Sequence, residues 1–306
     1  MQLSLLPIPI IQVKLLRSKL RYSVLFHPLP GTLNFKKMKK LVIYFSLFAF
    51  CLTGCKKIIE IDTENADPQL VIEGRINDSL IDQQIKISKT IGYTETNVFP
   101  KVSGASVTVT DSKGNTFVFK EGSTSGTYIN KMKGVPGVTY NLNVTAEGQT
   151  YTASSKMPNV VKMDSIGVIN NFFFGRERKT AAVFFKDPAN ETNFYHFNLY
   201  VNDVLSERFY VNNDRLTNGN DLRIQLFFNP PTNDHDSDEL NANDKIKIEM
   251  ECIDSNIFDY WYALSQQSNR GPNQGTTPAN PTSNISNQAL GYFSANTYQV
   301  LSATVK

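Results

Sequence analysis

A cysteine near the N-terminus sits in the sequence setting where lipid is attached to secreted precursors. Cys55 follows Leu52, Thr53 and Gly54, which end an apolar run with small residues, as a signal-peptide cleavage site requires. The expected chemistry is transfer of a diacylglyceryl group to the Cys55 thiol, cleavage before Cys55 and acylation of the new amine. Two or more acyl chains anchor a protein stably, whereas one binds only marginally. We therefore predict lipidation at Cys55 and signal-peptidase recognition through Leu52, Thr53 and Gly54.

A second group of residues that could do chemistry, here by binding a metal ion, is an acidic cluster in the C-terminal half. Asp234, Asp236 and Asp238 alternate along the chain, and carboxylate oxygens are ligands that Ca²⁺ prefers. The segment lacks the central glycine and the bidentate glutamate of a calcium-binding EF-hand loop. We therefore interpret it as a solvated acidic loop, keep these three aspartates as a weak metal candidate and predict no bound metal.

Catalytic motifs are missing from the sequence after the leader. Only His196 and His235 are available there as imidazoles, and the sequence contains no G-x-S-x-G, H-E-x-x-H or G-x-x-x-x-G-K-[ST] motif. Such motifs mark common hydrolases, metalloproteases and nucleotide-binding proteins. We predict no catalytic residues, no cofactor and no enzyme. Paired carboxylates of a glycan hydrolase stay open, because that geometry is not local in sequence.

Aromatic and loop residues offer candidate interfaces instead. Successive strand residues point to opposite faces, so at least one residue of the run Phe172-Phe173-Phe174 is predicted to face away from the core, either Phe173 or its two neighbours. Tyr260 belongs to a Tyr-Trp-Tyr run, and Pro278 and Asn280 lie in segment 271–283, which holds three prolines and two glycines. Loops of this length are typically functional or disordered. We name Phe173, Tyr260, Pro278 and Asn280 as candidate interface residues.

The elements that position these groups begin with a leader. We interpret residues 1–37 as an overextended start, with a two-part targeting sequence as the alternative, and residues 38–54 as a signal peptide. Its apolar run of 12 residues, 41–52, is too short for a membrane-spanning helix, which needs about 20 residues. Residues 55–68 follow as the lipidated cysteine and a tether.

The charge balance changes when the leader is removed. The whole chain holds 31 basic and 28 acidic residues, and residues 1–55 contain eight of the basic ones and no acidic one. The remainder therefore has 23 basic and 28 acidic residues, a net charge of −5. A basic surface is what nucleic acid attracts, so we predict no nucleic-acid partner.

The rest of the chain has the pattern of a mainly all-β protein. Short alternating runs separated by turn residues predict sandwich folds, with a domain boundary at Pro158 between residues 69–158 and 159–306. One helix is predicted near 255–268, because Ile257, Trp261 and Leu264 recur at helical spacing. The second β-rich domain therefore carries one short α-helix.

The motifs resemble those of a known family. They include Leu70 to Gly74, Val102 to Val109, Met157-Pro158, Phe258 to Trp261 and Thr277 to Pro281. The chain resembles the Bacteroidetes outer-membrane lipoproteins catalogued as domain of unknown function 4249. That resemblance implies an outer-membrane lipoprotein, often encoded near TonB-dependent receptors, without catalytic residues to carry over. Residues 103–110 also look like immunoglobulin-like or prealbumin-like modules, which predicts such a sandwich for 69–158.

These observations together predict a lipid-anchored outer-membrane protein that binds ligands. We expect it to act as an accessory of a TonB-dependent transporter in capturing or taking up a glycan or another small molecule. One alternative is a surface glycan-binding protein or glycan hydrolase, and another is a structural or adhesin-like surface protein. The membrane is a partner through the lipid, and the cell-surface and periplasmic faces both stay open.

Overall fold

The computed structural model describes residues 67–92, 95–173, 175–231, 239–268 and 280–306. Cys55 with its flanking motif, the acidic cluster of Asp234, Asp236 and Asp238, and Pro278 lie outside these residues. Contacts group residues 63–306 into one compact unit. No helix in the described residues has the length and apolar character needed to cross a membrane.

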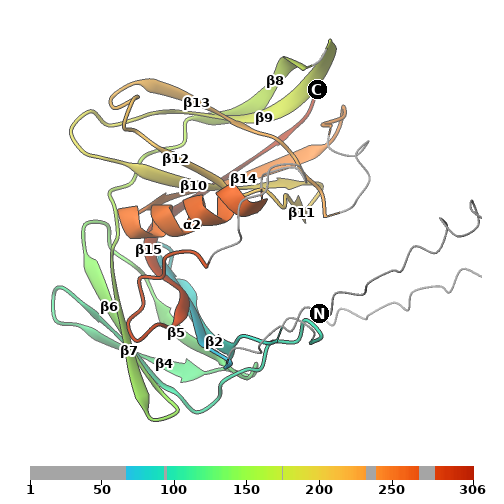
Figure 1. Cartoon of the computed structure of the whole chain (residues 1–306). Coiled ribbons are helices and arrows are strands. Elements are labelled where there is room, and N and C mark those ends of the chain that lie inside the picture. Colours follow the sequence, from blue (N-terminus) through green and yellow to red (C-terminus); the bar gives the residue numbers. More distant parts are fainter. Residues whose placement is uncertain (1–66, 93–94, 174, 232–238, 269–279) are drawn as a thin grey trace, which may run out of the picture. The chain divides into compact units, whose positions relative to one another are not determined.

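Strands make up most of the described chain, which confirms the mainly all-β prediction (Figure 1). The alternation of buried and exposed residues along them is the period-2 pattern of strands with one face on a core. The strands are β1 Leu70–Asn77, β2 Ile81–Lys89, β3 Ser106–Asp111, β4 Thr116–Glu121, β5 Thr127–Met132, β6 Thr139–Ala146, β7 Gln149–Lys156, β8 Ser165–Phe173, β9 Arg176–Lys186, β10 Phe194–Val201, β11 Val204–Leu205, β12 Tyr210–Asn213, β13 Asp221–Leu226, β14 Lys245–Ile253 and β15 Leu290–Thr304.

Within the described residues the strands form two sheets. The large sheet has twelve strands in the order β11-β10-β14-β15-β1-β2-β5-β4-β3-β6-β7, with β12 paired to β10. The small sheet has the order β13-β9-β8. The large sheet thus passes through both halves of the chain.

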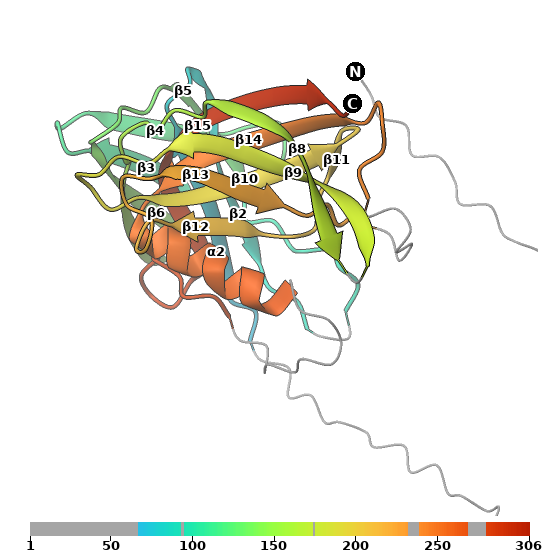
Figure 2. The same cartoon turned by 90° about the horizontal axis from the view of Figure 1, so that it is seen from above.

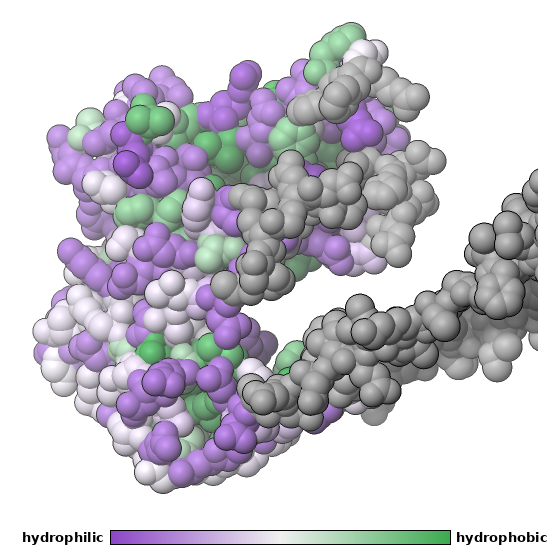
Figure 3. Space-filling model, in the orientation of Figure 1, coloured by the Kyte–Doolittle hydropathy of each residue, from purple (hydrophilic) through white to green (hydrophobic). Residues whose placement is uncertain are grey.

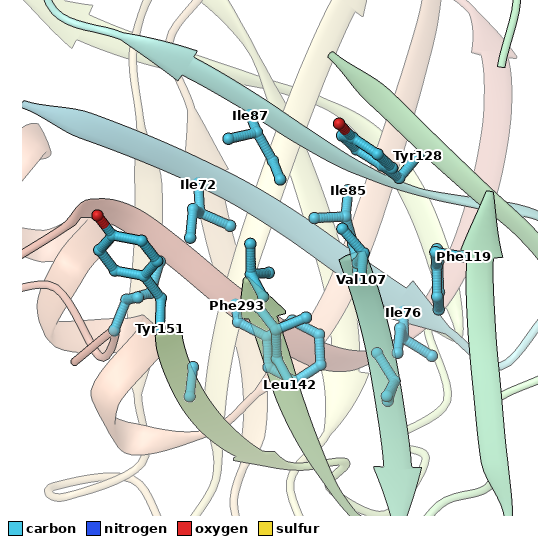
Figure 4. Packing of buried hydrophobic residues seen from close by; sticks show 14 of the residues in the cluster. Ile72, Ile76, Ile85, Ile87, Val107, Phe119, Tyr128, Leu142, Tyr151 and Phe293 are labelled. Atoms are coloured by element: carbon cyan, nitrogen blue, oxygen red, sulfur yellow. The ribbon is translucent and has the colours of Figure 1, made fainter. Parts of the chain in front are cut away.

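In the N-terminal half the large sheet faces itself across a hydrophobic core. Strands β4 and β5 are paired at only two positions, Lys120 with Ile129 and Glu121 with Tyr128. Buried side chains from β1 and β2, on one side of this junction, meet those from β3, β6 and β7 on the other (Figure 4). The result is a two-layer β-structure.

In the C-terminal half the small sheet packs on the large one. Strand β9 contributes Ala181, Val183 and Phe185 to a second core. Strands β10 and β14 supply the opposing layer, including Phe197 and Ile248. Figure 2 shows β9 and β13 lying over β10 and β14.

Strand β15 belongs to both halves. It is one continuous strand of 15 residues. Its first part pairs in parallel with β1, and its second part pairs antiparallel with β14. Core residues up to Met157 belong to the N-terminal core and those from Val161 onward to the second core, with four exceptions. Ile285, Ala289, Phe293 and Ala295 join the N-terminal core. The boundary at Pro158 stays a prediction.

Helix α2, Ser255–Ser268, covers the residues for which the sequence predicts a helix. Asp254 caps it, since its carboxylate accepts a hydrogen bond of 3.0 Å from the Ile257 N–H. Ile257 and Phe258 pack against Phe194 of β10. Figures 1 and 2 both show α2 beside β10 and β12.

Candidate functional site

The polar and ionisable side chains that could bind a ligand or take part in a reaction lie, within the described residues, mainly on the outer face of the large sheet. Their strand neighbours point into the cores, so alternation sends polar groups to the opposite face. We call this surface, across β10, β14, β15, β1 and β2, the polar face. The register places its members side by side. Leading members are His196, Glu249, Glu251, Tyr292, Glu73 and Arg75.

Glu251 is the centre of a buried network on the polar face. Its Oε1 accepts a 2.6 Å hydrogen bond from Nη1 of Arg75, and its Oε2 lies 3.0 Å from Nδ1 of His196. The side chains of Glu251 and His196 are each 4% exposed, whereas that of Arg75 is 44% exposed. One carboxylate therefore ties β1, β14 and β10 together and fixes one end of the Arg75 guanidinium.

The imidazole of His196 is held on its other side by an aromatic ring. Its ring stacks on Trp261 of α2 with centroids 4.6 Å apart and planes 14° apart. Nδ1 donates to the Glu251 carboxylate, and the buried Nε2 has no hydrogen-bond partner among the described residues. His196 thus positions Glu251 and supports the helix.

The electrostatics of Glu251 follow from opposing causes. Burial alone raises its pKa, but the hydrogen bond and charge of His196 and the charge of Arg75 outweigh burial and leave the pKa lowered. Glu251 accordingly remains ionised, and both of its oxygens are occupied. Its role in this arrangement is to position Arg75.

A second carboxylate on the polar face is also well satisfied. Glu249 accepts hydrogen bonds from the hydroxyl of Tyr298 at 2.9 Å and from the amide of Asn198 at 3.2 Å. Lys247 lies 3.8 Å above the centroid of the Tyr200 ring, a cation–π geometry. This part of the surface is bonded within itself, which leaves the β1 and β2 side for a ligand.

A pocket of about 370 Å³ opens on the β1 and β2 side of the polar face. We call it the charged pocket. It is polar, unlike the mostly apolar pockets of drug-like ligands. Its chemically active members are Glu73, Arg75, Asp82, Gln84, Lys86 and Tyr292.

Aromatic rings from α2 and β15 adjoin the charged pocket. Tyr292 lines it and packs on Tyr260 and Trp261, with ring centroids 5.0 and 5.3 Å away. Burial raises the pKa of Tyr260 to about 12, with the charge of Glu73 as a second cause. The aromatic ring of Tyr292 therefore lines the charged pocket and is held in place by two aromatic side chains of α2.

The structure places the candidate interface residues in different settings. Tyr260 is half-buried and adjoins the charged pocket through Tyr292. Phe173 ends β8, with its side chain outside the described residues, and its neighbour Phe172 is 78% exposed. Asn280 is exposed. The role of Phe173, Tyr260, Pro278 and Asn280 as interface residues stays a prediction.

The single histidine and single cysteine that the structure describes after the leader are both buried. Cys252 is a free thiol, 1% exposed in the second core. Within the described residues no three histidine, cysteine, aspartate or glutamate side chains are grouped to hold a metal ion.

Sequence reasoning missed the charged pocket itself. Its signal is visible in β1, where Glu73 and Arg75 alternate with Ile72, Gly74 and Ile76 in an otherwise core-forming strand. The pairing of β1 with β15 and the approach of β14 decide which groups meet there. The contact between Arg75 and Glu251 joins residues 176 positions apart and leaves no local signal.

Fold and site together define a mainly β protein with two hydrophobic cores, one shared sheet and a polar pocket on that sheet's outer face. A protein family described as "Domain of unknown function (DUF4249)" matches residues 56–301, and the chain belongs to that family. A comparison with curated proteins gives no match.

Proposed function

We propose that this protein is a lipid-anchored outer-membrane binding protein that captures a small polar ligand and works with a TonB-dependent transporter. The observation that supports it best is the charged pocket with its prepositioned Arg75. A binding group that is already ordered loses less entropy when a ligand arrives. The protein would capture and present its ligand without chemical change.

The geometry of the two buried carboxylates, Glu249 and Glu251, supports a positioning role for them. A general acid or base must have a free oxygen within reach of its substrate. Both oxygens of Glu251 are engaged, and Glu249 accepts from three side chains, Tyr298, Asn198 and Tyr200. These groups hold the site in shape.

The sequence supports the location in this proposal. Cys55 ends a signal-like segment, and lipidation there would keep the protein at a membrane. Residues 55–68 would give the folded part reach toward a transporter. On the face that Figure 3 shows, exposed apolar residues form small groups among hydrophilic ones.

Membrane fractionation and co-purification test the proposal together. We expect the Cys55→Ser variant to leave the membrane fraction, whereas Cys51→Ser, which alters a cysteine inside the leader, stays there. After mild detergent extraction, the lipidated protein should be recovered with a transporter. Retention of Cys55→Ser in membranes would contradict the anchor, and recovery of the wild type alone would contradict the transporter partnership.

A further inference from the structure

We propose that the charged pocket binds one ring of a neutral saccharide. This inference rests on the capture role proposed above and names the class of ligand. It is carried by the way the pocket mixes unpaired donors and acceptors beside an aromatic ring.

The register arranges the pocket groups in rows across three strands. Lys86 of β2, Glu73 of β1 and Tyr292 of β15 are partners in one row. Gln84 and Arg75 are partners in the next row. Neighbouring strands lie about 4.8 Å apart and alternate residues on one strand about 6.8 Å apart, so the groups surround an area about as wide as one sugar ring.

The charges in the pocket alternate instead of gathering by sign. Arg75 and Lys86 are basic, and Glu73 and Asp82 are acidic. Glu73, Asp82 and Lys86 are exposed, and none of the three has an ion-pair partner within 4.0 Å in the part of the chain that the structure describes. The two positive and two negative charges balance, so the pocket has no net charge that would favour an anion over a cation.

A hydroxyl group suits this mixture because it donates one hydrogen bond and accepts others. It can donate to the carboxylates of Glu73 or Asp82 and accept from the ammonium of Lys86. A ligand with several adjacent hydroxyls would satisfy both kinds of group together, whereas a simple ion would leave one kind unpaired.

Arg75 supplies the directional contact. Its Nη1 is committed to Glu251, and the guanidinium retains Nε and Nη2 donors in a planar fork. The side chain lines the pocket and is 44% exposed. Because Glu251 holds it in place, the remaining donors are aimed before a ligand arrives.

Tyr292 supplies the apolar contact. A sugar ring has an apolar face of C–H groups, and tyrosine combines an apolar ring face with a polar tip. Tyr292 lines the pocket, and its ring packs on the rings of Tyr260 and Trp261. An ordered ring at the pocket edge gives the saccharide a platform.

Glycan-array binding followed by calorimetry tests the assignment on the chain without its leader, residues 56–306. The probes are neutral gluco-, xylo-, manno- and galacto-oligosaccharides, with glycylglycine, citrate and spermidine as charged comparisons. We expect binding of at least one neutral saccharide, with less than about a twofold change in Kd when salt rises from about 0.05 M to about 0.5 M.

Substitutions locate the binding. Glu73→Ala and Lys86→Ala, both at exposed positions, should each weaken saccharide binding by about tenfold, because each removes a charged hydrogen bond. Lys120→Ala, an exposed lysine on β4 outside the pocket, is the matched control and should leave Kd unchanged. Circular dichroism verifies that each variant folds.

Two outcomes overturn the saccharide assignment. One is no saccharide binding anywhere on the array, and the other is saccharide binding that Glu73→Ala and Lys86→Ala leave intact. If glycylglycine or citrate binds and Glu73→Ala or Lys86→Ala alters that binding, the ligand class is wrong while the proposed capture role stands. Loss of the capture role would instead appear as recovery without a transporter in the co-purification experiment.

Discussion

A buried carboxylate is stable as an ion only when its surroundings replace the water it has lost. Glu251 shows how this is done here, with one oxygen on the guanidinium of Arg75 and the other on the imidazole of His196. The partners come from β1 and β10, on either side of the β14 and β15 pair. At the residue scale, the site therefore depends on one acidic side chain that orders two basic ones.

Replacing Glu251 with glutamine should lower the free energy of unfolding by about 2 kcal/mol. Glutamine carries no charge to pair with Arg75, and it has one acceptor oxygen where glutamate has two, so it cannot accept from both Arg75 and His196 on separate oxygens. The value lies below that of a fully buried pair because Arg75 is half exposed. Urea unfolding measures it, and Glu73→Gln on the same face is the control, expected to change stability by less than about 0.5 kcal/mol.

The pH dependence supplies a second check on Glu251. Its folded-state pKa lies below the usual 4.5, so its contribution is present above that value and is lost as pH falls through the folded pKa. The stability gap between wild type and Glu251→Gln should therefore shrink on acidification below pH 4.5. A gap that stays constant or grows would show that Glu251 is not stabilised as an ion.

At the element scale, β15 determines how the two halves meet. Its residue Gly291 pairs with Ile72 of β1 at φ +93°, a conformation that side chains with a Cβ rarely adopt. A Cβ there would lie 2.1 Å from the carbonyl oxygen of Ile72. Glycine is therefore required where β15 begins its approach to β1.

The Gly291→Ala change should destabilise the protein by about 3 kcal/mol, from backbone strain and collision with β1. Gly137→Ala is a matched control, since Gly137 has φ +81° but no atom within 4 Å of the added Cβ. It should cost about 1 kcal/mol, from strain alone. Thermal unfolding measures the loss of stability in each variant. Equal losses of stability in the two variants would argue against the close approach of β15 to β1.

At the scale of the whole molecule, the N-terminal core is completed by residues from the far end of the chain. Ile285, Ala289, Phe293 and Ala295 are buried in it, and Ile285 is bridged to Ala153 of β7. The first core therefore does not consist of residues 69–158 alone, although the two cores are otherwise separated near Pro158.

A fragment of residues 67–158 should fail to unfold cooperatively. It lacks the parallel partner of β1 and the four apolar residues that fill its core, so too little apolar surface is buried to offset the chain entropy. Adding a synthetic peptide of residues 283–298 should restore dispersed amide resonances. Dispersed NMR spectra from the fragment alone would instead support the sequence-predicted boundary as a true domain limit.

Much of the element pattern could be predicted from local sequence. Period-2 alternation in β6 and β7 specifies strands with one buried face. Asp254 and the spacing of Ile257 and Trp261 specify α2. Helix caps and strand alternation depend on neighbours a few residues apart, which a single sequence displays directly.

The candidate site could be predicted only in part, for a physical reason. Tyr260 was selected because aromatic runs mark surfaces, but its placement beside Tyr292 depends on β15. The alternation in β1 marks Arg75 as a surface residue, but its pairing with Glu251 has no local signal. The two positions are 176 apart, and strand pairing brings them together.

The sequence by itself determined the mainly β character, the helix and the prediction of lipid attachment at Cys55, because each rests on residue types and short-range spacing. Only the tertiary structure decided that β15 is one strand shared by two cores and that Glu251 aims Arg75 into a pocket. Strand alternation sends a side chain to one face or the other. The pairing of strands that are distant in sequence determines which other side chains lie next to it on that face.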